Sequence, residues 1–254
     1  MARLDRFFLP RADWPGPGQD RAALTGQEAR HLGKVLRHKL GDRVQCFDGA
    51  GREGEFEILA LAKDRAELTL VSVQEYPEPV HRPCLAVGWS KSARRGWLME
   101  KAVELEAGEL LFWRAERGQG SPPDDPKDSW NEKLIQAAKQ CGNPWLPRLS
   151  CLGGVTQLAA VADRFSRCYV LYEGADAQVG ILGPEHFVPG PALLVIGPEG
   201  GLTEAEVAVL TGAGMRPLSL GQRVLRYETA ALVALSLGYI AGQQSSKADT
   251  HSMP

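Results

Sequence analysis

Towards the C-terminus, the pattern of hydrophobic positions predicts two buried strands that each lead through a glycine turn into a helix. The first apolar run, residues 192–196, ends in Gly-Pro-Glu-Gly-Gly at 197–201, and helical spacing follows at once. The second, residues 218–220, ends at Gly221 and leads into another helix. Ligands of α/β proteins bind outside the carboxyl ends of such strands, where backbone N–H groups and helix N-termini lie free. We therefore expect a ligand site here.

Upstream of this stretch, apolar runs alternate with helical patterns. Strands are expected at 84–89, 110–113 and 169–172, and helices at about 96–107 and 130–140. Strands that are separated by helices pair in parallel. The sequence therefore predicts an α/β domain over residues 84–242.

Residues 1–75 are mostly of β type and predict a small barrel or curled sheet. Residues 44–47, 55–58 and 66–71 alternate like strands with one wet face, and Asp48-Gly49 is typical of a tight hairpin connection. We assign Glu53, Glu55 and Glu57 to that wet face. One helix is expected; it begins at a capping box, Thr25 to Glu28, and continues with apolar residues at helical spacing, namely Ala29, Leu32, Val35 and Leu36.

The segments at the domain boundary and at the C-terminus have distinct compositions. Residues 76–83 are rich in proline and lack periodicity, so they are the expected linker. Residues 243–254 are polar and are expected to form a disordered tail. The helix expected just before this tail, about 228–241, is apolar nearly all round. Such a helix must be covered on most sides, which favours a homodimer.

Composition narrows the class of protein. With 44% hydrophobic residues, 24% charged residues and a formal net charge of −2, the chain is typical of a soluble globular protein. The net charge argues against a globally basic nucleic-acid binder but leaves local basic patches open. Its five cysteines include no C-x-x-C pair, and its histidines lack ligand-like spacing, so neither a disulfide framework nor a metal site is expected. The sequence contains neither a signal-peptide pattern nor an apolar run of bilayer length, which favours a cytoplasmic location and no membrane partner.

The turn at 197–201 matches neither G-x-G-x-x-G nor the Walker A loop, so a nucleotide phosphate is not its expected ligand. Its glycines let a ligand lie directly against backbone N–H and C=O groups. A capping box from Thr203 to Glu206 fills the next helix N-terminus, which favours a flat, neutral group such as adenine over an anion. A tight strand-to-helix turn without a ligand explains this stretch equally well.

Two arginines, Arg223 and Arg226, flank an apolar pair in the second turn. Arginine is rarely buried without a partner, so both are candidates for contacting a ligand. The alternative is an ion pair between Arg226 and Glu228 that only caps the last helix.

Together, LLVIGPEGGLTEAEV at 193–207 and LSLGQRVLRYETAALVAL at 218–235 resemble the SPOUT methyltransferases, specifically the ribosomal small subunit methyltransferase E family. HLGKVLR at 31–37 and FDG at 47–49 are similar to the PUA-like RNA-binding domain of that family. Further similar segments are Lys101 with Glu104-Leu105, and Gln140-Cys141-Gly142 with Pro147. The resemblance therefore covers nearly the whole chain.

This resemblance implies an S-adenosylmethionine-dependent enzyme that methylates N3 of a uridine in 16S rRNA. It also implies a homodimer and a deep trefoil knot in the C-terminal α/β domain. In the family, backbone groups of the glycine turns and the knot loop hold the cofactor. Here these positions are Gly197, Glu199, Gly200, Gly201, Leu220, Gly221, Val224, Leu225 and Arg226.

Several positions depart from the family pattern. Tyr227 replaces the first threonine of R-x-L-R-T-E-T, and Asn143 replaces an arginine. Glu106-Ala107 stands for the Gly-Val of E-L-G-V, and Ala115 begins the family's S-E-R segment. The cofactor loops are intact, whereas these substitutions lie where RNA or substrate is expected. The resemblance therefore specifies the cofactor more closely than the RNA target.

The expected chemistry assigns roles to three side chains. As N3 of uridine loses its proton, negative charge spreads onto O2 and O4, where a fixed guanidinium would stabilise it. Arg226 is the first candidate for this role and Arg223 the second. The proton acceptor is Glu228 or water.

RNA contact is expected at the N-terminal helix. N3 lies on the pairing edge of uridine, so the base must be unpaired or flipped out. One face of the helix is expected to bind phosphates, a solvated helix face being the alternative; its basic residues are Arg30, Lys34 and Arg37.

Two rival functions remain at this stage: a SPOUT enzyme that methylates a ribose 2′-oxygen, and a non-catalytic RNA-binding or ribosome-assembly module. The R-V-L-R-x-E-T run argues against the first, and the intact glycine turns argue against the second.

Overall fold

The computed structural model describes residues 4–91, 94–172, 179–187 and 190–251. The chain divides into two compact units. The first comprises Met1–Glu78 with Ala138–Leu146, and the second comprises Pro79–Ala137 with Pro147–Pro254. The sequence pattern did not indicate that a segment after residue 137 returns to the first unit.

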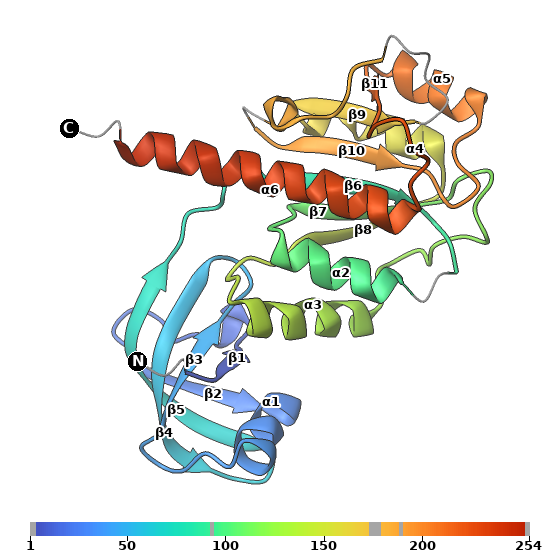
Figure 1. The fold of residues 1–254 in the computed structure, drawn as a ribbon. Helices are drawn as coiled ribbons and strands as arrows, with labels where there is room; N and C mark the ends of the chain where they lie inside the picture. The colour runs from blue at the N-terminus through green and yellow to red at the C-terminus, as the bar shows by residue number, and fades with distance from the viewer. Residues whose placement is uncertain (1–3, 92–93, 173–178, 188–189, 252–254) are drawn as a thin grey trace. The chain divides into compact units, whose positions relative to one another are not determined.

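The first unit is built on a curled sheet of five strands in the order β1-β3-β4-β5-β2 (Figure 1). Its strands are β1 Arg6–Phe8, β2 Arg21–Thr25, β3 Arg43–Phe47, β4 Arg52–Leu61 and β5 Arg65–Glu75. All pairs are antiparallel except β1 with β3. Alternating residues such as Val44, Phe56 and Leu68 are fully buried on its inner face, as the period of two predicts.

The helix of this unit is shorter than predicted. It comprises α1, Gly26–Arg30, followed by a π-helical turn, η2, His31–Val35. A π turn holds more residues than an α turn. Leu32 consequently stays buried, while Val35 and Leu36 are 65% and 39% exposed instead of facing the core.

The predicted capping box at this helix does not form. Thr25 is the N-cap residue but its side chain accepts no capping hydrogen bond. The Glu28 carboxylate instead accepts hydrogen bonds from the Phe8 N–H at 3.1 Å and from Lys139 Nζ at 3.0 Å. A charged donor is a stronger partner for a carboxylate than an N–H group of the helix itself. The prediction of a capping box is therefore wrong at this helix.

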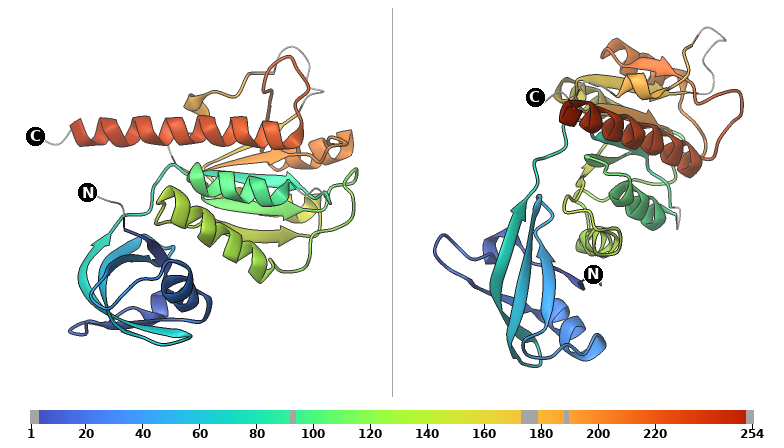
Figure 2. Two further views of the ribbon diagram at one scale, coloured as in Figure 1. Left: turned by 60° about the horizontal axis from the view of Figure 1, so that its bottom comes forward. Right: turned by 60° about the vertical axis from the view of Figure 1, so that its left-hand side comes forward.

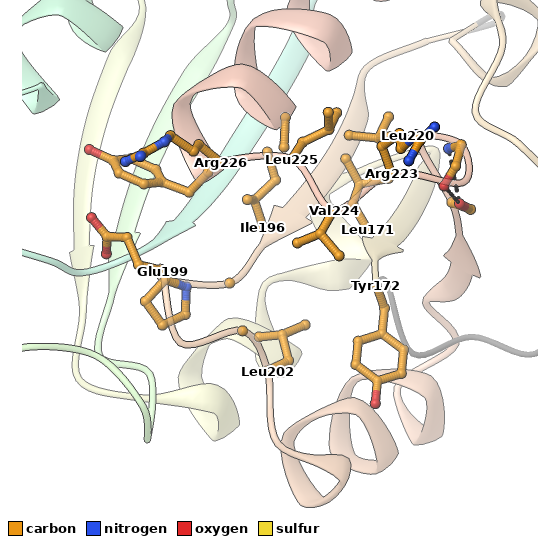
Figure 3. A pocket seen from close by; sticks show the side chains of 17 residues that line it. Leu171, Tyr172, Ile196, Glu199, Leu202, Leu220, Arg223, Val224, Leu225 and Arg226 are labelled. Carbon is orange, nitrogen blue, oxygen red and sulfur yellow. Dashed lines mark hydrogen bonds between the residues drawn. The ribbon is translucent and has the colours of Figure 1, made fainter.

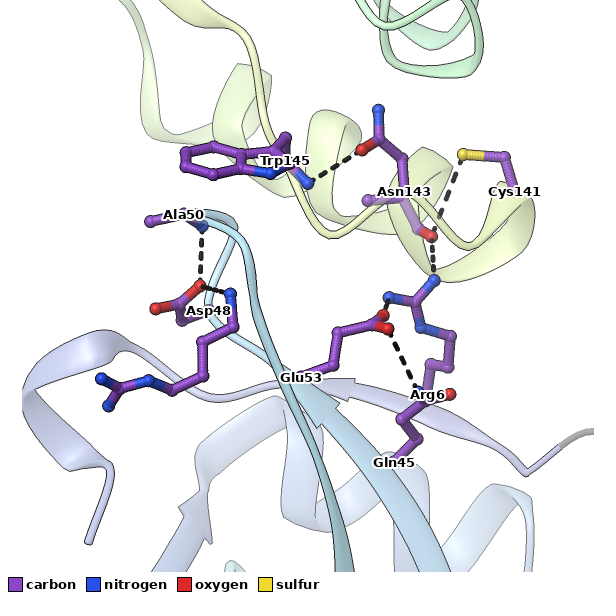
Figure 4. A network of polar contacts seen from close by, with 10 residues as sticks. Arg6, Gln45, Asp48, Ala50, Glu53, Cys141, Asn143 and Trp145 are labelled. Carbon is purple, nitrogen blue, oxygen red and sulfur yellow. Dashed lines mark hydrogen bonds and ion pairs between the residues drawn. The ribbon is translucent and has the colours of Figure 1, made fainter. Parts of the chain in front are cut away.

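Glu53 does not lie on the solvent-exposed face of β4 that the alternation of its strand predicts. Its side chain is buried and forms an ion pair with buried Arg6, whose Nη1 also donates to the Ala138 carbonyl at 3.2 Å (Figure 4). The β3–β4 connection, also drawn there, spans four residues rather than two. It is held by Asp48 Oδ1, which accepts the N–H groups of Ala50 and Arg52 at 2.7 and 3.0 Å.

The second unit contains a parallel sheet of six strands in the order β11-β9-β10-β6-β7-β8. Its strands are β6 Pro83–Gly88, β7 Glu109–Trp113, β8 Arg148–Leu152, β9 Arg167–Leu171, β10 Ala192–Ile196 and β11 Arg216–Leu218. The parallel α/β prediction is confirmed. The sequence missed β8, an edge strand whose residues are only half-buried, because it lacks the continuous apolar run of the inner strands.

Helices cover both faces of this sheet (Figure 2). On one face, α4 Val155–Ala160 and α5 Glu204–Gly212 bury Leu158 and Leu210 against alternate strand residues. On the other face, α6 Tyr227–His251 packs on β6 and β10 and beside α2 Arg95–Glu104. The next helix in the chain after α2 is α3 Asp128–Cys141. Helix α6 continues past Gln243 to His251, so the predicted disordered tail is wrong for that stretch. Its Gln, Lys and Ala residues are good helix formers that extend an existing helix at little cost.

Candidate active site

Three strands of the second unit end side by side. Register pairs Ile196 with Leu171 and Leu171 with Leu218, so the loops that follow β10, β9 and β11 meet at one edge of the sheet. A cavity of about 340 Å³ lies there (Figure 3). This volume falls within the range of small-molecule sites, about 300–1,000 Å³. Every predicted cofactor residue lines the cavity except Gly200.

The loop after β10 is a turn packed on itself. The Gly201 N–H donates to the Pro198 carbonyl at 2.9 Å, and Gly201 has a φ of +72° that favours glycine. A Cβ on Gly197 would lie 3.0 Å from the Gly201 backbone. The predicted capping box follows and is confirmed: the Thr203 N–H donates to Glu206 at 2.9 Å, and the Glu206 N–H donates to Thr203 Oγ1 at 3.2 Å.

The loop after β11 presents apolar side chains to the cavity. Gly221 has a φ of +117°, and its N–H donates to Ser219 Oγ at 3.0 Å, which fixes the turn. Beyond it, Val224 lines the cavity and is 76% exposed. An exposed branched side chain in a hollow lined by Leu171 and Ile196 is a surface that a flat apolar group can cover.

Both predicted arginines line the cavity, but on opposite sides. Figure 3 shows Arg226 beside Glu199, and Arg223 beside Leu220. Both arginines are exposed, and within the described part of the chain neither forms an ion pair with a carboxylate. Their charges are therefore available to a ligand.

Glu228, by contrast, is not brought to the cavity. It is buried at the start of α6 and forms its ion pair with Arg94. The alternative in which Glu228 merely pairs with Arg226 is therefore wrong.

The structure adds neighbours that the sequence did not indicate. Ser90, just after β6, donates to Glu199 Oε1 at 3.2 Å. The Arg95 guanidinium lies 4.1 Å from the ring centroid of buried Trp89 and donates to the Ser90 carbonyl at 3.1 Å. Burial lowers the pKa of Arg95 below its ordinary value. These residues precede or begin α2, far from the glycine turns in sequence, so no local pattern could have linked them.

The three predicted RNA-contacting residues lie in the first unit and are all exposed. Arg30 ends α1 and pairs with Asp64 at 3.5 Å, Lys34 lies in the π turn, and Arg37 follows it with a φ of +59°. They are therefore not on one regular helix face as predicted, because the α-helix ends after Arg30.

The family follows from comparison with known proteins. Residues 77–238 match the family model of the RNA methyltransferase domain, and residues 24–71 match that of the RNA methyltransferase PUA domain. The chain is 32% identical over 243 residues to ribosomal RNA small subunit methyltransferase E of Bacillus subtilis, an alignment that covers 92% of this chain and 95% of the relative. The chain belongs to the ribosomal RNA small subunit methyltransferase E family.

Solved structures agree with this membership. A methyltransferase E from Neisseria gonorrhoeae bound to S-adenosyl methionine is 28% identical with a TM-score of 0.78, covering 92% of this chain and 96% of that one. A Legionella pneumophila protein in complex with the cofactor SAM is 29% identical with a TM-score of 0.80, covering 94% and 98%. The predicted family, its α/β fold and its PUA-like first unit are thus confirmed.

Among the described residues, no group of three or more His, Cys, Asp or Glu side chains could hold a metal ion. No helix in the described ranges combines the length and apolar character needed to cross a membrane.

Proposed function

We propose that this protein transfers the methyl group of S-adenosylmethionine to N3 of a uridine in 16S ribosomal RNA. The observation that carries the proposal is the cavity at the ends of β9, β10 and β11, where apolar side chains and glycine turns meet two arginines that form no ion pair within the described ranges. Membership of the methyltransferase E family supplies the reaction class.

The cavity suits S-adenosylmethionine chemically. An adenine needs a flat apolar surface and backbone hydrogen-bonding groups at its edge. Val224 and Leu225 provide the first, and the lining glycines Gly197, Gly201 and Gly221 bring the backbone to the cavity surface for the second. Gly200 would act indirectly, since a Cβ there would lie 3.0 Å from Arg117 Cβ. When bound, the cofactor supplies an electrophilic methyl group on a sulfonium.

Arg226 and Arg223 have separate roles in this proposal because they lie on opposite sides of the cavity. Arg226 stands beside Glu199, and we assign it to the uracil carbonyl oxygen where charge develops as N3 loses its proton. Arg223 lies beside Leu220 of the cofactor turn, and we assign it to the cofactor side. Glu228, buried against Arg94, would position the start of α6 rather than touch the substrate.

RNA binding is assigned to the first unit, with Arg30, Lys34 and Arg37 as phosphate contacts. Exposed Val35 and Leu36 beside them give an unpaired base an apolar surface. Since N3 is the pairing edge, the target uridine must be held out of any duplex. The five free cysteines fit the reducing cytoplasm that we propose as the location.

We also propose a homodimer and a trefoil knot. The outer stripe of α6 includes half-buried Val233 and Leu237 and 45% exposed Ile240, which a second copy would cover. The order of the strands supports the knot. In the sheet β10 lies between β9 and β6, although β7, β8 and β9 come between β6 and β10 in the chain. Both features belong to the proposed function.

Calorimetric titration with S-adenosylmethionine, followed by mapping of the methylated nucleotide, tests the proposal. Saturable binding by the protein and a new N3-methyl group on a single uridine of 16S rRNA are expected. A methyl group on a ribose 2′-oxygen would show that the enzyme modifies the ribose and not N3 of the base. Absence of S-adenosylmethionine binding, both with and without RNA, would contradict the proposal that the protein is a methyltransferase.

A further inference from the structure

We infer that Glu199 is the proton acceptor for uridine N3, an inference that rests on the proposed function. Glu199 is the one carboxylate among the described residues that line the cavity. It follows Pro198 in the turn after β10, the central strand whose carboxyl end opens into the site.

One oxygen of this carboxylate is fixed and the other is available. Ser90 Oγ donates to Oε1 at 3.2 Å, which orients the group and leaves Oε2 as an acceptor. The turn itself is held by close packing, because a Cβ on Gly88 would lie 2.6 Å from Pro198. Within the described ranges Glu199 forms no ion pair, so its negative charge is not already matched.

The position of Glu199 relative to Arg226 fits the charges that develop. Figure 3 shows both side chains on the same side of the cavity. A uracil ring presents N3–H between two carbonyl oxygens, so a carboxylate and a guanidinium side by side match a donor and its neighbouring acceptor. Glu228 does not offer this arrangement, since it is buried, paired with Arg94 and absent from the cavity lining.

The N3–H bond breaks, the proton passes to Oε2 of Glu199, and the electron pair stays on N3, where it can attack the methyl donor. Part of the resulting charge resides on the carbonyl oxygen that Arg226 faces. The neutral carboxylic acid then returns its proton to water, because Glu199 is exposed.

Glu199→Gln tests the inference, with Glu204→Gln as the matched control. Glu204 is exposed in the first turn of α5 and lies outside the cavity lining. Single-turnover methylation at saturating cofactor should fall about 10²- to 10⁴-fold in Glu199→Gln, the usual contribution of a general base, and stay unchanged in Glu204→Gln. Cofactor affinity by calorimetry should stay within a few-fold.

The pH profile gives a readout that a merely structural role would not move. If Glu199 accepts the proton, the wild-type rate should vary little between about pH 6 and pH 9, because N3 need not ionise before it meets the enzyme. The Glu199→Gln rate should rise about tenfold per pH unit, because only uridine ionised beforehand then reacts. In RNA that carries 5-fluorouridine, N3 of the target base is more acidic. This substrate should raise the methylation rate of Glu199→Gln far more than that of the wild type.

Two results would overturn the inference. A Glu199→Gln rate and pH profile equal to those of the wild type would remove the proton role. Weak cofactor binding with a full rate at saturation would make Glu199 a cofactor residue only. If the wild type itself methylates no rRNA uridine, the proposed function fails, and that result is distinct from either.

Discussion

The guanidinium of Arg117 lies over the backbone of Gly200 and donates from Nη1 to its carbonyl oxygen at 3.4 Å. The same nitrogen reaches the Leu202 carbonyl at 3.4 Å. Next to it, the Glu116 N–H donates to the Glu206 carboxylate at 2.7 Å, and Glu206 completes the cap of α5. The turn after β7 is therefore fastened to the loop after β10 that lines the cavity.

This contact predicts that Arg117→Ala weakens cofactor binding although Arg117 lies outside the cavity lining. Two long, exposed hydrogen bonds contribute about 1 kcal/mol together, so the dissociation constant for S-adenosylmethionine should rise about fivefold. Calorimetry measures this, with exposed Arg114→Ala as the control and Arg117→Lys as a partial rescue. Equal affinities for Arg117→Ala and Arg114→Ala would contradict the prediction.

Arg226→Ala should separate turnover from cofactor binding. Loss of a preorganised donor to developing charge costs about 10²- to 10³-fold in rate, while cofactor affinity should change by no more than a few-fold. Arg223→Ala, on the other side of the cavity, should instead raise the apparent KM for the cofactor. Rapid-quench methylation at saturating cofactor distinguishes the two, and the assignment fails if Arg226→Ala turns over at the wild-type rate.

The sequence predicted the second unit more fully than the first. Its inner strands are continuous apolar runs, and its glycine turns are recognisable as short sequence motifs. The strands, the helices and the loops that line the cavity could therefore be located from short stretches of sequence. The features that the sequence did not predict depend on residues far away in the chain. Glu28 binds Lys139 instead of capping its own helix, and Glu53 pairs with Arg6 instead of facing solvent. Period and propensity carry no information about such partners.

The site was predicted in composition but not in arrangement. The resemblance gave nine cofactor positions in two short motifs, and all of them except Gly200 line the cavity. It could not show that Arg223 and Arg226 lie on opposite sides of the cavity, or that Glu228 forms its ion pair with Arg94. The pair of Arg94 and Glu228 joins the starts of α2 and α6, which lie about 130 positions apart in the sequence.

Replacing Arg30, Lys34 and Arg37 together by glutamate should abolish RNA binding and leave cofactor affinity unchanged. Each lost phosphate contact reduces the salt dependence of binding by about one unit of slope, and reversed charges repel the backbone. Filter binding to a 16S fragment over a salt series measures this. Because Arg30 also pairs with Asp64, replacing Arg30 alone should weaken RNA binding less than replacing Lys34 or Arg37 alone. RNA affinity that survives the triple change would place the contact surface elsewhere.

The cysteines predict a simple labelling pattern. Burial raises the pKa of Cys84 to about 12 and those of Cys151 and Cys168 to about 11, and it raises that of Cys46 further. Since only the thiolate reacts, at most about one in a thousand of these groups is reactive at pH 8. A disulfide reagent should therefore label exposed Cys141 first and the others after unfolding or at strongly alkaline pH. Fast labelling of all five native thiols at pH 8 would contradict this.

The outer stripe of α6 predicts how the homodimer can be broken. Val233, Leu237 and Ile240 repeat at helical spacing and are half-buried or exposed, while Ala231 and Leu235 face the sheet. Leu237→Glu would bury an unpaired charge in the interface at a cost of about 3–5 kcal/mol, which weakens the dimer by a factor of roughly 10² to 10³ or more. Sedimentation velocity should then show the mass of one chain, whereas Gln244→Glu, on the same helix and exposed, should remain dimeric. A Leu237→Glu variant that still sediments as a dimer would move the interface off this helix.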